Sequence, residues 1–447
     1  MKNLSIILLL LSLSFSAKAQ EKFAFSLDEA VDYALNNSYI ALNASRDIEA
    51  AKKKKWETTT IGLPQVDAAI DYQNWIKQQV ALIPAEFFGG TAGDFIEVSF
   101  GTKHNMNATA TLRQLIFDGS YLVGLQSART YLKISENAKE KTELGIREAV
   151  INAYGNVFMS EESVVILEKK LSTLTTNLRE LKEIYANGFV EEESVEQLEI
   201  TLSTVNSQLS RTERMRDIAY KMLNIALGLD INTEVELTDS LSGLAISHSD
   251  LSLLSSDFNM EEHIDFKIAK NTERSNELLL KLEKSRALPT LNSFINFGYA
   301  GYAEKFDFLD KDQNWFDSSL LGVSLEIPIF SSLARSSRTQ QAKIELDKAR
   351  TNLTETEQRI QLALESARTD YNYSLEELEN SKRNLELAER IEKKQQIKFF
   401  EGISTSFELT EAQRQLYTMQ QNYLQAMFDV IAKKAALDNA LNIPTTN

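Results

Sequence analysis

The sequence contains no cysteine, only five prolines in 447 residues, and a modest sixteen glycines. Without cysteine the chain can form neither a disulfide framework nor a thiol-linked lipid anchor. So few helix breakers over this length favour long, uninterrupted helices over a series of small globular domains. The three histidines show no metal-ligand spacing, so we expect no metal site and no cofactor.

Basic side chains are outnumbered by acidic ones, 48 to 64, which gives a formal net charge of −16. Binding to nucleic acid needs a basic footprint, so this balance argues against a nucleic-acid partner. The sequence also has no phosphate-binding glycine loop, no nucleophile elbow and no zinc-binding helix motif. We therefore predict that the protein is not an enzyme.

The first nineteen residues have the pattern of a secretory signal peptide. Lys2 supplies a positive start, residues 4–13 are mostly apolar, and Ala17-Lys18-Ala19 forms a cleavage site between Ala19 and Gln20. The apolar run is too short for a stable membrane span, although an uncleaved anchor is the alternative. No later segment has eighteen consecutive apolar residues, so the sequence predicts no membrane-spanning helix after the signal.

A series of short signals occurs twice in the same order. Each half has a Leu-Pro pair (63–64 and 288–289) and then an Ile-Phe pair (116–117 and 329–330). Each half ends the series with an aromatic residue three positions before a glycine: Tyr185 before Gly188, and Phe399 before Gly402. Matched signals in a fixed order indicate a tandem duplication.

Two proline-free spans of nearly equal length, 119–188 and 332–402, lie between these signals. In the first span, the apolar residues Leu167, Leu171, Leu174, Leu178, Leu181 and Tyr185 alternate spacings of four and three, the seam of a coiled coil. At ~1.5 Å per residue, each span forms a helix roughly 100 Å long. Gly188 and Gly402 then lie at the tips of two helical hairpins.

Four other stretches, within 66–72, 104–117, 291–299 and 321–327, alternate apolar with small or polar residues. Strands with one apolar and one polar face are typical of a membrane barrel with a wet interior, although a soluble sandwich also alternates this way. Four strands cannot close a barrel, which needs about eight even when side chains fill the interior. If these strands enter a membrane, the chain must therefore form an oligomer.

The ordered signals together resemble the TolC-like outer membrane efflux family over almost the whole chain after residue 19. The resemblance adds the opening Ser26-Leu27-Asp28-Glu29-Ala30, which is similar to the family's first helix. It implies a mainly helical protomer of long antiparallel coiled-coil helices with four transmembrane β-strands. Three protomers would share one twelve-stranded barrel in the outer membrane lipid of a Gram-negative bacterium, with a large periplasmic part.

The predicted boundaries follow from the repeat and the resemblance. They are a signal peptide over 1–19, a first periplasmic helix over 20–64, strands with an extracellular loop over 65–118, a helical hairpin over 119–228, an equatorial segment over 229–256, a helix over 257–288, two more strands with a loop over 289–331, a second hairpin over 332–442 and a tail over 443–447.

Functional residues are expected at the hairpin tips. The resemblance places Glu408 and Glu411 in a carboxylate ring at the periplasmic aperture, although a solvated helix face is the simpler explanation. It also implies that an adaptor docks at the tips, which carry Tyr185, Gly188, Phe399 and Gly402. The run Glu191-Glu192-Glu193 either adds negative potential there or suits the positive end of a helix dipole.

The predicted function is a passive channel-tunnel of a tripartite efflux or type I secretion system. Its implied partners are two further copies of the chain, a periplasmic adaptor and an inner-membrane transporter. A periplasmic coiled-coil adaptor or envelope scaffold without a channel is the alternative. Adaptors combine one helical hairpin with β-rich modules, whereas this sequence predicts two hairpins and two strand pairs. The cargo is not encoded in any motif of this sequence.

Overall fold

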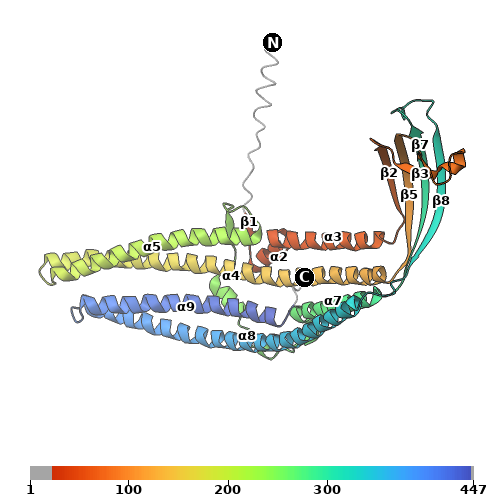
Figure 1. Cartoon of the computed structure of the whole chain (residues 1–447). Helices are drawn as coiled ribbons and strands as arrows, with labels where there is room; N and C mark the ends of the chain where they lie inside the picture. The colour runs from red at the N-terminus through yellow and green to blue at the C-terminus, as the bar shows by residue number, and fades with distance from the viewer. Residues whose placement is uncertain (1–22, 444–447) are drawn as a thin grey trace, which may run out of the picture. The chain divides into compact units, whose positions relative to one another are not determined.

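The computed structural model describes residues 23–443, coloured in Figure 1. The predicted signal peptide over 1–19, with its cleavage site at Ala19 and Gln20, lies outside the described residues, as does most of the predicted tail. The chain divides into two compact units. We call 1–48, 135–269 and 352–447 the helical unit, and 49–134 and 270–351 the sheet unit. Each unit therefore combines segments from both sequence repeats.

The elements of the helical unit are mostly helices. They are β1 (Phe23–Phe25), α2 (Leu27–Asn37), the first part of α3 (Tyr39–Thr60), most of α4 (Gly119–Ala186), α5 (Glu192–Leu227), β6 (Val235–Leu237), α6 (Leu241–Ser247), η2 (Leu251–Ser255), η3 (Met260–Glu262), the start of α7 (Ile264–Ser285), most of α8 (Ala334–Phe400) and α9 (Ser406–Ala440). The sheet unit holds the remainder of α3, α4, α7 and α8 together with β2 (Gln65–Asn74), β3 (Val80–Pro84), η1 (Ala85–Phe88), β4 (Phe95–Ser99), β5 (His104–Asp118), β7 (Thr290–Ala303) and β8 (Trp315–Glu326).

The prediction of two very long helices is confirmed. Helix α4 has 68 residues and α8 has 67, and each is followed by a shorter helix that turns back alongside it in the helical unit (Figure 1). Among the helices of residues 23–443, none combines the length and the hydropathy needed to cross a bilayer.

The predicted coiled-coil seam packs α4 against α5. Leu167, Leu174 and Val205 form one buried cluster, with Leu198 and Leu202 packed against it. Fully burying a leucine contributes roughly 1.5–3 kcal/mol relative to exposure, so Leu167 and Leu174 help to hold the two helices of the first hairpin together. The polar residue Asn177 of α4 is also buried, with 3% of its surface exposed, and the heptad pattern did not predict this.

The single helix predicted over 20–64 is wrong, because the chain forms two helices here. Ser38 ends α2 in an extended conformation, with ψ at 147°. Its hydroxyl oxygen then accepts a hydrogen bond from the backbone nitrogen of Ala41 (3.3 Å) and so caps the start of α3. A serine that leaves one helix and caps the next breaks the helix without a proline.

The predicted equatorial segment packs onto the long helices of its unit. Strand β6 pairs in parallel with β1, and the Tyr154 hydroxyl of α4 lies 3.0 Å from a carboxylate oxygen of Asp239 and 2.9 Å from the Phe25 carbonyl. On α8, the buried Tyr371 hydroxyl donates to the His248 carbonyl (2.6 Å). Two buried tyrosines, one from each repeat, therefore anchor this segment.

The four predicted strands form one antiparallel sheet in the order β2-β5-β7-β8. Strands from the two repeats meet at the centre, where β5 pairs with β7 along nearly its whole length. Strands β2 and β8 lie at the two edges of this sheet. Each edge strand leaves a row of backbone groups without a partner within the described chain, which is the feature that an oligomer would satisfy.

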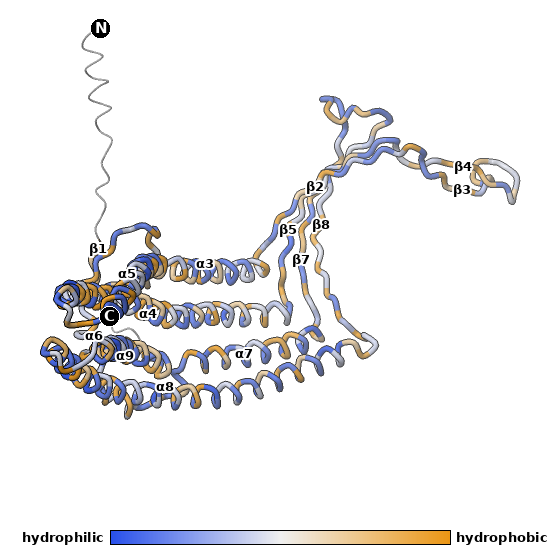
Figure 2. The backbone as a smooth tube through the Cα atoms, turned by 90° about the vertical axis from the view of Figure 1, so that its left-hand side faces the viewer, coloured by the Kyte–Doolittle hydropathy of each residue, from blue (hydrophilic) through white to orange (hydrophobic). Residues whose placement is uncertain are grey.

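The extracellular loop predicted within 65–118 contains a small hairpin. Strand β3 pairs with β4, and the turn between them begins with the 3₁₀ helix η1. The run Val-Ala-Leu-Ile of β3 does not alternate between apolar and polar residues, so the period-two pattern used for the other strands misses it. Figure 2 shows this hairpin extending from the end of the four-stranded sheet.

Candidate functional site

Both hairpin tips have the same backbone geometry. Gly188 and Gly402 follow α4 and α8 in the left-handed conformation, with φ of 77° and 72°. Their backbone nitrogens donate to the carbonyls of Tyr185 (2.8 Å) and Phe399 (3.0 Å), the two predicted aromatic positions. The next residue in each tip bonds to the carbonyl five positions earlier, which completes a Schellman motif. The repeated aromatic-x-x-glycine signal is therefore a helix stop.

The two tips lie side by side in the helical unit. The Ser406 hydroxyl at the start of α9 donates to the Ser194 hydroxyl near the start of α5 (3.2 Å). The residues that follow the tip glycines, Phe189 and Ile403, are 82% and 69% exposed. In a Schellman motif this position usually packs back onto its own helix, so its exposure leaves apolar surface at both tips.

The acidic run after the first tip begins a helix. Glu191 is the N-cap residue of α5, and Glu192 and Glu193 occupy its first turn. Carboxylates in a first turn interact favourably with the helix dipole. This placement accounts for the run structurally, and it leaves the carboxylates exposed at the tip.

Glu408 and Glu411 are both exposed at the start of α9, and each has a local partner. The carboxylate of Glu408 accepts a hydrogen bond from the backbone nitrogen of Thr405 (2.9 Å), and the Thr405 hydroxyl accepts one from the backbone nitrogen of Glu408 (3.2 Å). This reciprocal capping box fixes where the helix begins. The sequence signal for it, threonine three residues before glutamate, was not recognised in the sequence analysis.

Glu411 forms a two-point ion pair with Arg414, with nitrogen–oxygen distances of 2.5 and 2.9 Å. The hydrogen bonds from Arg414 hold the pKa of the Glu411 carboxyl below its ordinary value. Sequence reasoning did not name Arg414, although a spacing of three on a helix is a recognised ion-pair spacing. Within one chain, the paired arginine offsets the charge of Glu411.

The four-stranded sheet is the second candidate site, because its register separates two faces across all four strands. One row of paired residues is entirely apolar: Val66, Leu112, Ile295 and Leu321. The adjacent row, on the opposite face, is Asp67, Thr111, Asn296 and Leu320. Two independent alternating patterns, one from each repeat, are thus aligned into a single two-faced sheet.

Side chains on the polar face bond to one another. Arg113 pairs with Asp67 across the first two strands (2.5 Å), and the Asn296 amide donates to the Thr111 hydroxyl (2.9 Å). On the other face, Val66 and Leu321 are about 70% exposed at the two edges. An exposed apolar face on a sheet whose other face is hydrogen-bonded marks a surface that another apolar medium or chain covers.

An aromatic cluster lies at one end of the four-stranded sheet, where β2 ends and β5 begins. The rings of Tyr72, Phe306 and Phe308 pack together, and Trp315 packs against Phe308 with centroids 6.1 Å apart. The Tyr72 hydroxyl lies 2.7 Å from the Nδ1 atom of His104. Aromatic residues at this level are typical of the interface girdle of membrane sheets, and here they also pack against one another.

Residues 266–442 match the model of a known family, described as outer membrane efflux protein. Over this part of its length the chain is similar to outer membrane efflux proteins. This match confirms the expected family and the expected location in the outer membrane. No curated protein matches the sequence.

Solved structures of outer membrane proteins resemble almost the whole chain. VceC from Vibrio cholerae is 16% identical, with a TM-score of 0.72, 93% of this chain covered and 96% of that chain. The CmeC outer membrane channel of Campylobacter jejuni is 17% identical, with a TM-score of 0.72 and coverage of 93% and 85%. The MtrE outer membrane channel of Neisseria gonorrhoeae is 14% identical, with a TM-score of 0.69 and coverage of 93% and 88%. At these identities the comparisons establish the fold, which confirms the predicted architecture of long helices with a strand part.

Proposed function

We propose that this chain is one protomer of a homotrimeric efflux channel, without enzymatic activity, that conducts substrates passively across the outer membrane. The two-faced sheet is the observation that carries the proposal. Its row Val66, Leu112, Ile295 and Leu321 would face lipid, and its row Asp67, Thr111, Asn296 and Leu320 would face water.

The edges of the sheet support the trimer. Unpaired strand edges are not tolerated in lipid, and four strands are too few to enclose a water-filled lumen. If β8 of one copy pairs with β2 of the next, three copies give a closed barrel of twelve strands. The long helices would then form the periplasmic part.

The tips support a role in a larger assembly, because their apolar residues Phe189 and Ile403 are exposed. We infer that a periplasmic adaptor covers them and that an inner-membrane transporter supplies the cargo, as in a tripartite efflux or type I secretion system. The chain itself holds no energy source in this scheme. Cargo enters when the tips separate and then diffuses outward.

Electron microscopy of the detergent-extracted protein, expressed with its full sequence, tests the assembly. We expect particles with threefold symmetry in which a detergent belt surrounds a twelve-stranded barrel. Monomeric particles without a barrel would contradict the channel and favour an envelope scaffold instead.

If Glu408 and Glu411 form a carboxylate ring at the aperture, removing their charges should lower the channel's preference for cations, and removing the charge of Arg414 should raise it. The double variant Glu408→Gln, Glu411→Gln keeps the capping box, since glutamine also serves at that position, and removes two negative charges from each copy. We expect its cation-over-anion permeability ratio to fall about twofold or more, as expected for charges about 10 Å from a water-filled path. Reversal potentials in planar bilayers under a salt gradient measure this ratio.

The matched variant Arg414→Gln should change selectivity in the other direction. It frees Glu411 from its ion pair and removes the offsetting positive charge, so the cation preference should rise. If neither variant moves the reversal potential, the two glutamates do not line the conducting path, and they serve only the start of helix α9.

A further inference from the structure

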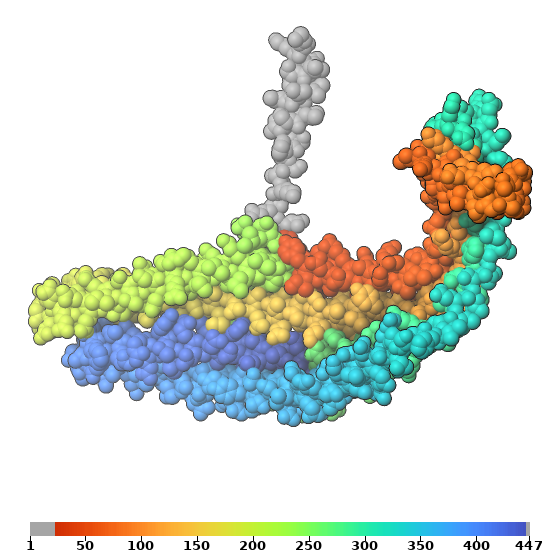
Figure 3. Space-filling view, in the orientation of Figure 1, coloured from red at the N-terminus to blue at the C-terminus, as the bar shows by residue number. Residues whose placement is uncertain are grey.

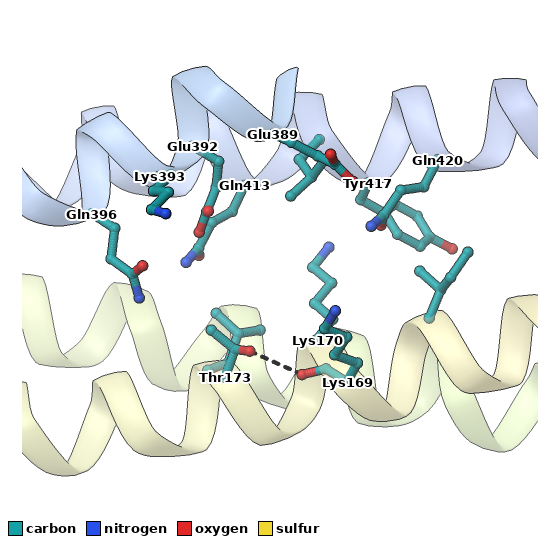
Figure 4. A pocket seen from close by; sticks show the side chains of 13 residues that line it. Lys169, Lys170, Thr173, Glu389, Glu392, Lys393, Gln396, Gln413, Tyr417 and Gln420 are labelled. Carbon is teal, nitrogen blue, oxygen red and sulfur yellow. Dashed lines mark hydrogen bonds between the residues drawn. The ribbon is translucent and has the colours of Figure 1, made fainter. Parts of the chain in front are cut away.

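A cleft of about 410 Å³ lies in the helical unit between α4 on one side and α8 and α9 on the other (Figure 4). Its volume is within the range of pockets that hold small organic ligands. Ile166, Leu174 and Leu416 supply apolar lining, and the amides of Gln396, Gln413 and Gln420 supply polar lining. Nothing in the proposed conduction mechanism uses this cleft.

Five charged side chains line the cleft: Lys169, Lys170 and Lys393 against Glu389 and Glu392. Long helices of this kind normally pair such groups, and nearby Glu411 and Arg414 do so. Within residues 23–443, however, no acidic group lies within ion-pairing distance of the Lys170 ammonium group. The lining therefore carries one net positive charge, and Lys170 forms no ion pair with any of the described residues.

Lys170 reaches from α4 across the cleft toward the α8–α9 side (Figure 4). Its Nζ atom lies 4.2 Å from the centre of the Tyr417 ring, a cation–π contact that leaves N–H donors available. Burial lowers the pKa of this ammonium group. A half-buried cation held by an aromatic face gains much from a carboxylate, because charge-assisted hydrogen bonds are the strong ones.

Gln413 supplies a second observation that points to a ligand. It lies one helical turn before Tyr417, so both side chains are on the same face of α9, and both line the cleft together with Lys170. Its side chain is 9% exposed, and its Nε2 atom is buried without an acceptor among the described residues. An amide donor buried in this way is costly unless something accepts from it.

We propose that this cleft binds a small organic carboxylate. One carboxylate oxygen accepts from the Lys170 ammonium group and the other from the Gln413 amide, which turns slightly toward the cleft. The apolar body of the ligand lies against Ile166, Leu174 and Leu416. Lys169 and Lys393 offset the two glutamates, so the anion does not enter a negative field. This inference is independent of the channel proposal.

Three probes of the same shape test the charge requirement: 4-fluorobenzoate, the neutral 4-fluorobenzamide and the cationic 4-fluorobenzylamine. Fluorine NMR titration of the detergent-solubilised full-length protein measures each affinity, with protein-free micelles as the background. We expect saturable binding of the benzoate. The other two probes should bind at least about ten times more weakly, which is the difference expected for one charge-assisted hydrogen bond.

Matched variants locate the site. Lys170→Met should weaken benzoate binding about tenfold, to the level of the amide, while Lys394→Met, at an exposed position of α8 outside the cleft lining, should leave it within about twofold of the unmodified protein. Lys170→Arg keeps the charge and should retain most of the affinity. Circular dichroism checks that each variant is folded. Equal binding of all three probes, an unchanged affinity in Lys170→Met, or no saturable binding of the benzoate would each overturn the proposal.

Discussion

The Leu321→Arg variant is expected to be lost almost completely from the outer membrane. Leu321 lies in the middle of β8, in the apolar row with Val66, Leu112 and Ile295, and it is 71% exposed. In the proposed channel this side chain faces lipid. An arginine on the lipid face of a membrane strand costs ~2–4 kcal/mol at the bilayer midplane, and the cost is incurred in each copy of a trimer.

The neighbouring Leu320→Arg variant is the matched control. Leu320 has the same side chain, lies on the same strand and is 59% exposed, but its row contains Asp67, Thr111 and Asn296. An arginine there would face water and could interact with acidic and amide groups. The amount of heat-resistant oligomer in outer membrane fractions, measured by immunoblot, should stay near normal for Leu320→Arg and fall severely for Leu321→Arg. Equal amounts would show that the two faces do not differ in environment, which contradicts a lipid-facing sheet.

The periodic parts of the fold could be predicted because one physical requirement repeats along each of them. The spacing from Leu167 to Leu181 recurs because α4 must present one stripe to α5, and Leu167, Leu174 and Leu181 are indeed fully buried. The alternation of the four strands reflects the two faces of the sheet. Because the sequence is duplicated, each pattern occurs twice in the same order, and a chance match is therefore less probable than for a single occurrence.

Helix caps and ion pairs within one helix are also encoded locally in the sequence, but the predictions did not use them. Ser38 separates α2 from α3 by capping, and the predicted helix over 20–64 overlooked it because only proline and glycine were considered as breakers. The Thr405–Glu408 capping box and the Glu411–Arg414 pair are also local. They show that two residues assigned to an aperture ring also have roles within their own helix.

The cleft could not be predicted, because it depends on contacts between distant segments. Lys170 belongs to the first repeat, whereas Tyr417 and Gln413 belong to the second. In the sequence Lys170 is one of many lysines on long polar helices, and such residues are most often solvated. The packing of α4 near α9 half-buries this one against Tyr417, with no carboxylate of the described residues in ion-pairing distance.

Two glycines with almost the same backbone conformation provide the last prediction. Gly228 ends α5 with φ of 81°, and Gly188 ends α4 with φ of 77°. A β-carbon at Gly188 would meet nothing within 4 Å, whereas one at Gly228 would lie 2.4 Å from the Asn37 carbonyl oxygen. Alanine in this conformation costs about 1–2 kcal/mol at either position. At Gly228 the helix end must also separate from α2, which adds about 1–3 kcal/mol as overpacking.

Gly228→Ala should therefore destabilise the helical unit much more than Gly188→Ala. Thermal unfolding of the detergent-solubilised protein, followed by circular dichroism at the helix band, compares the two. We expect a small decrease in the midpoint for Gly188→Ala and a decrease about two to three times as large for Gly228→Ala, because only the second combines strain with a backbone clash. Similar decreases would mean that α2 yields at no cost, and that the junction between β1, α2 and the equatorial segment is loosely held. A large difference would instead identify this junction, anchored by Tyr154 and Asp239, as the rigid point at which the N-terminal segment is fixed to the long helices.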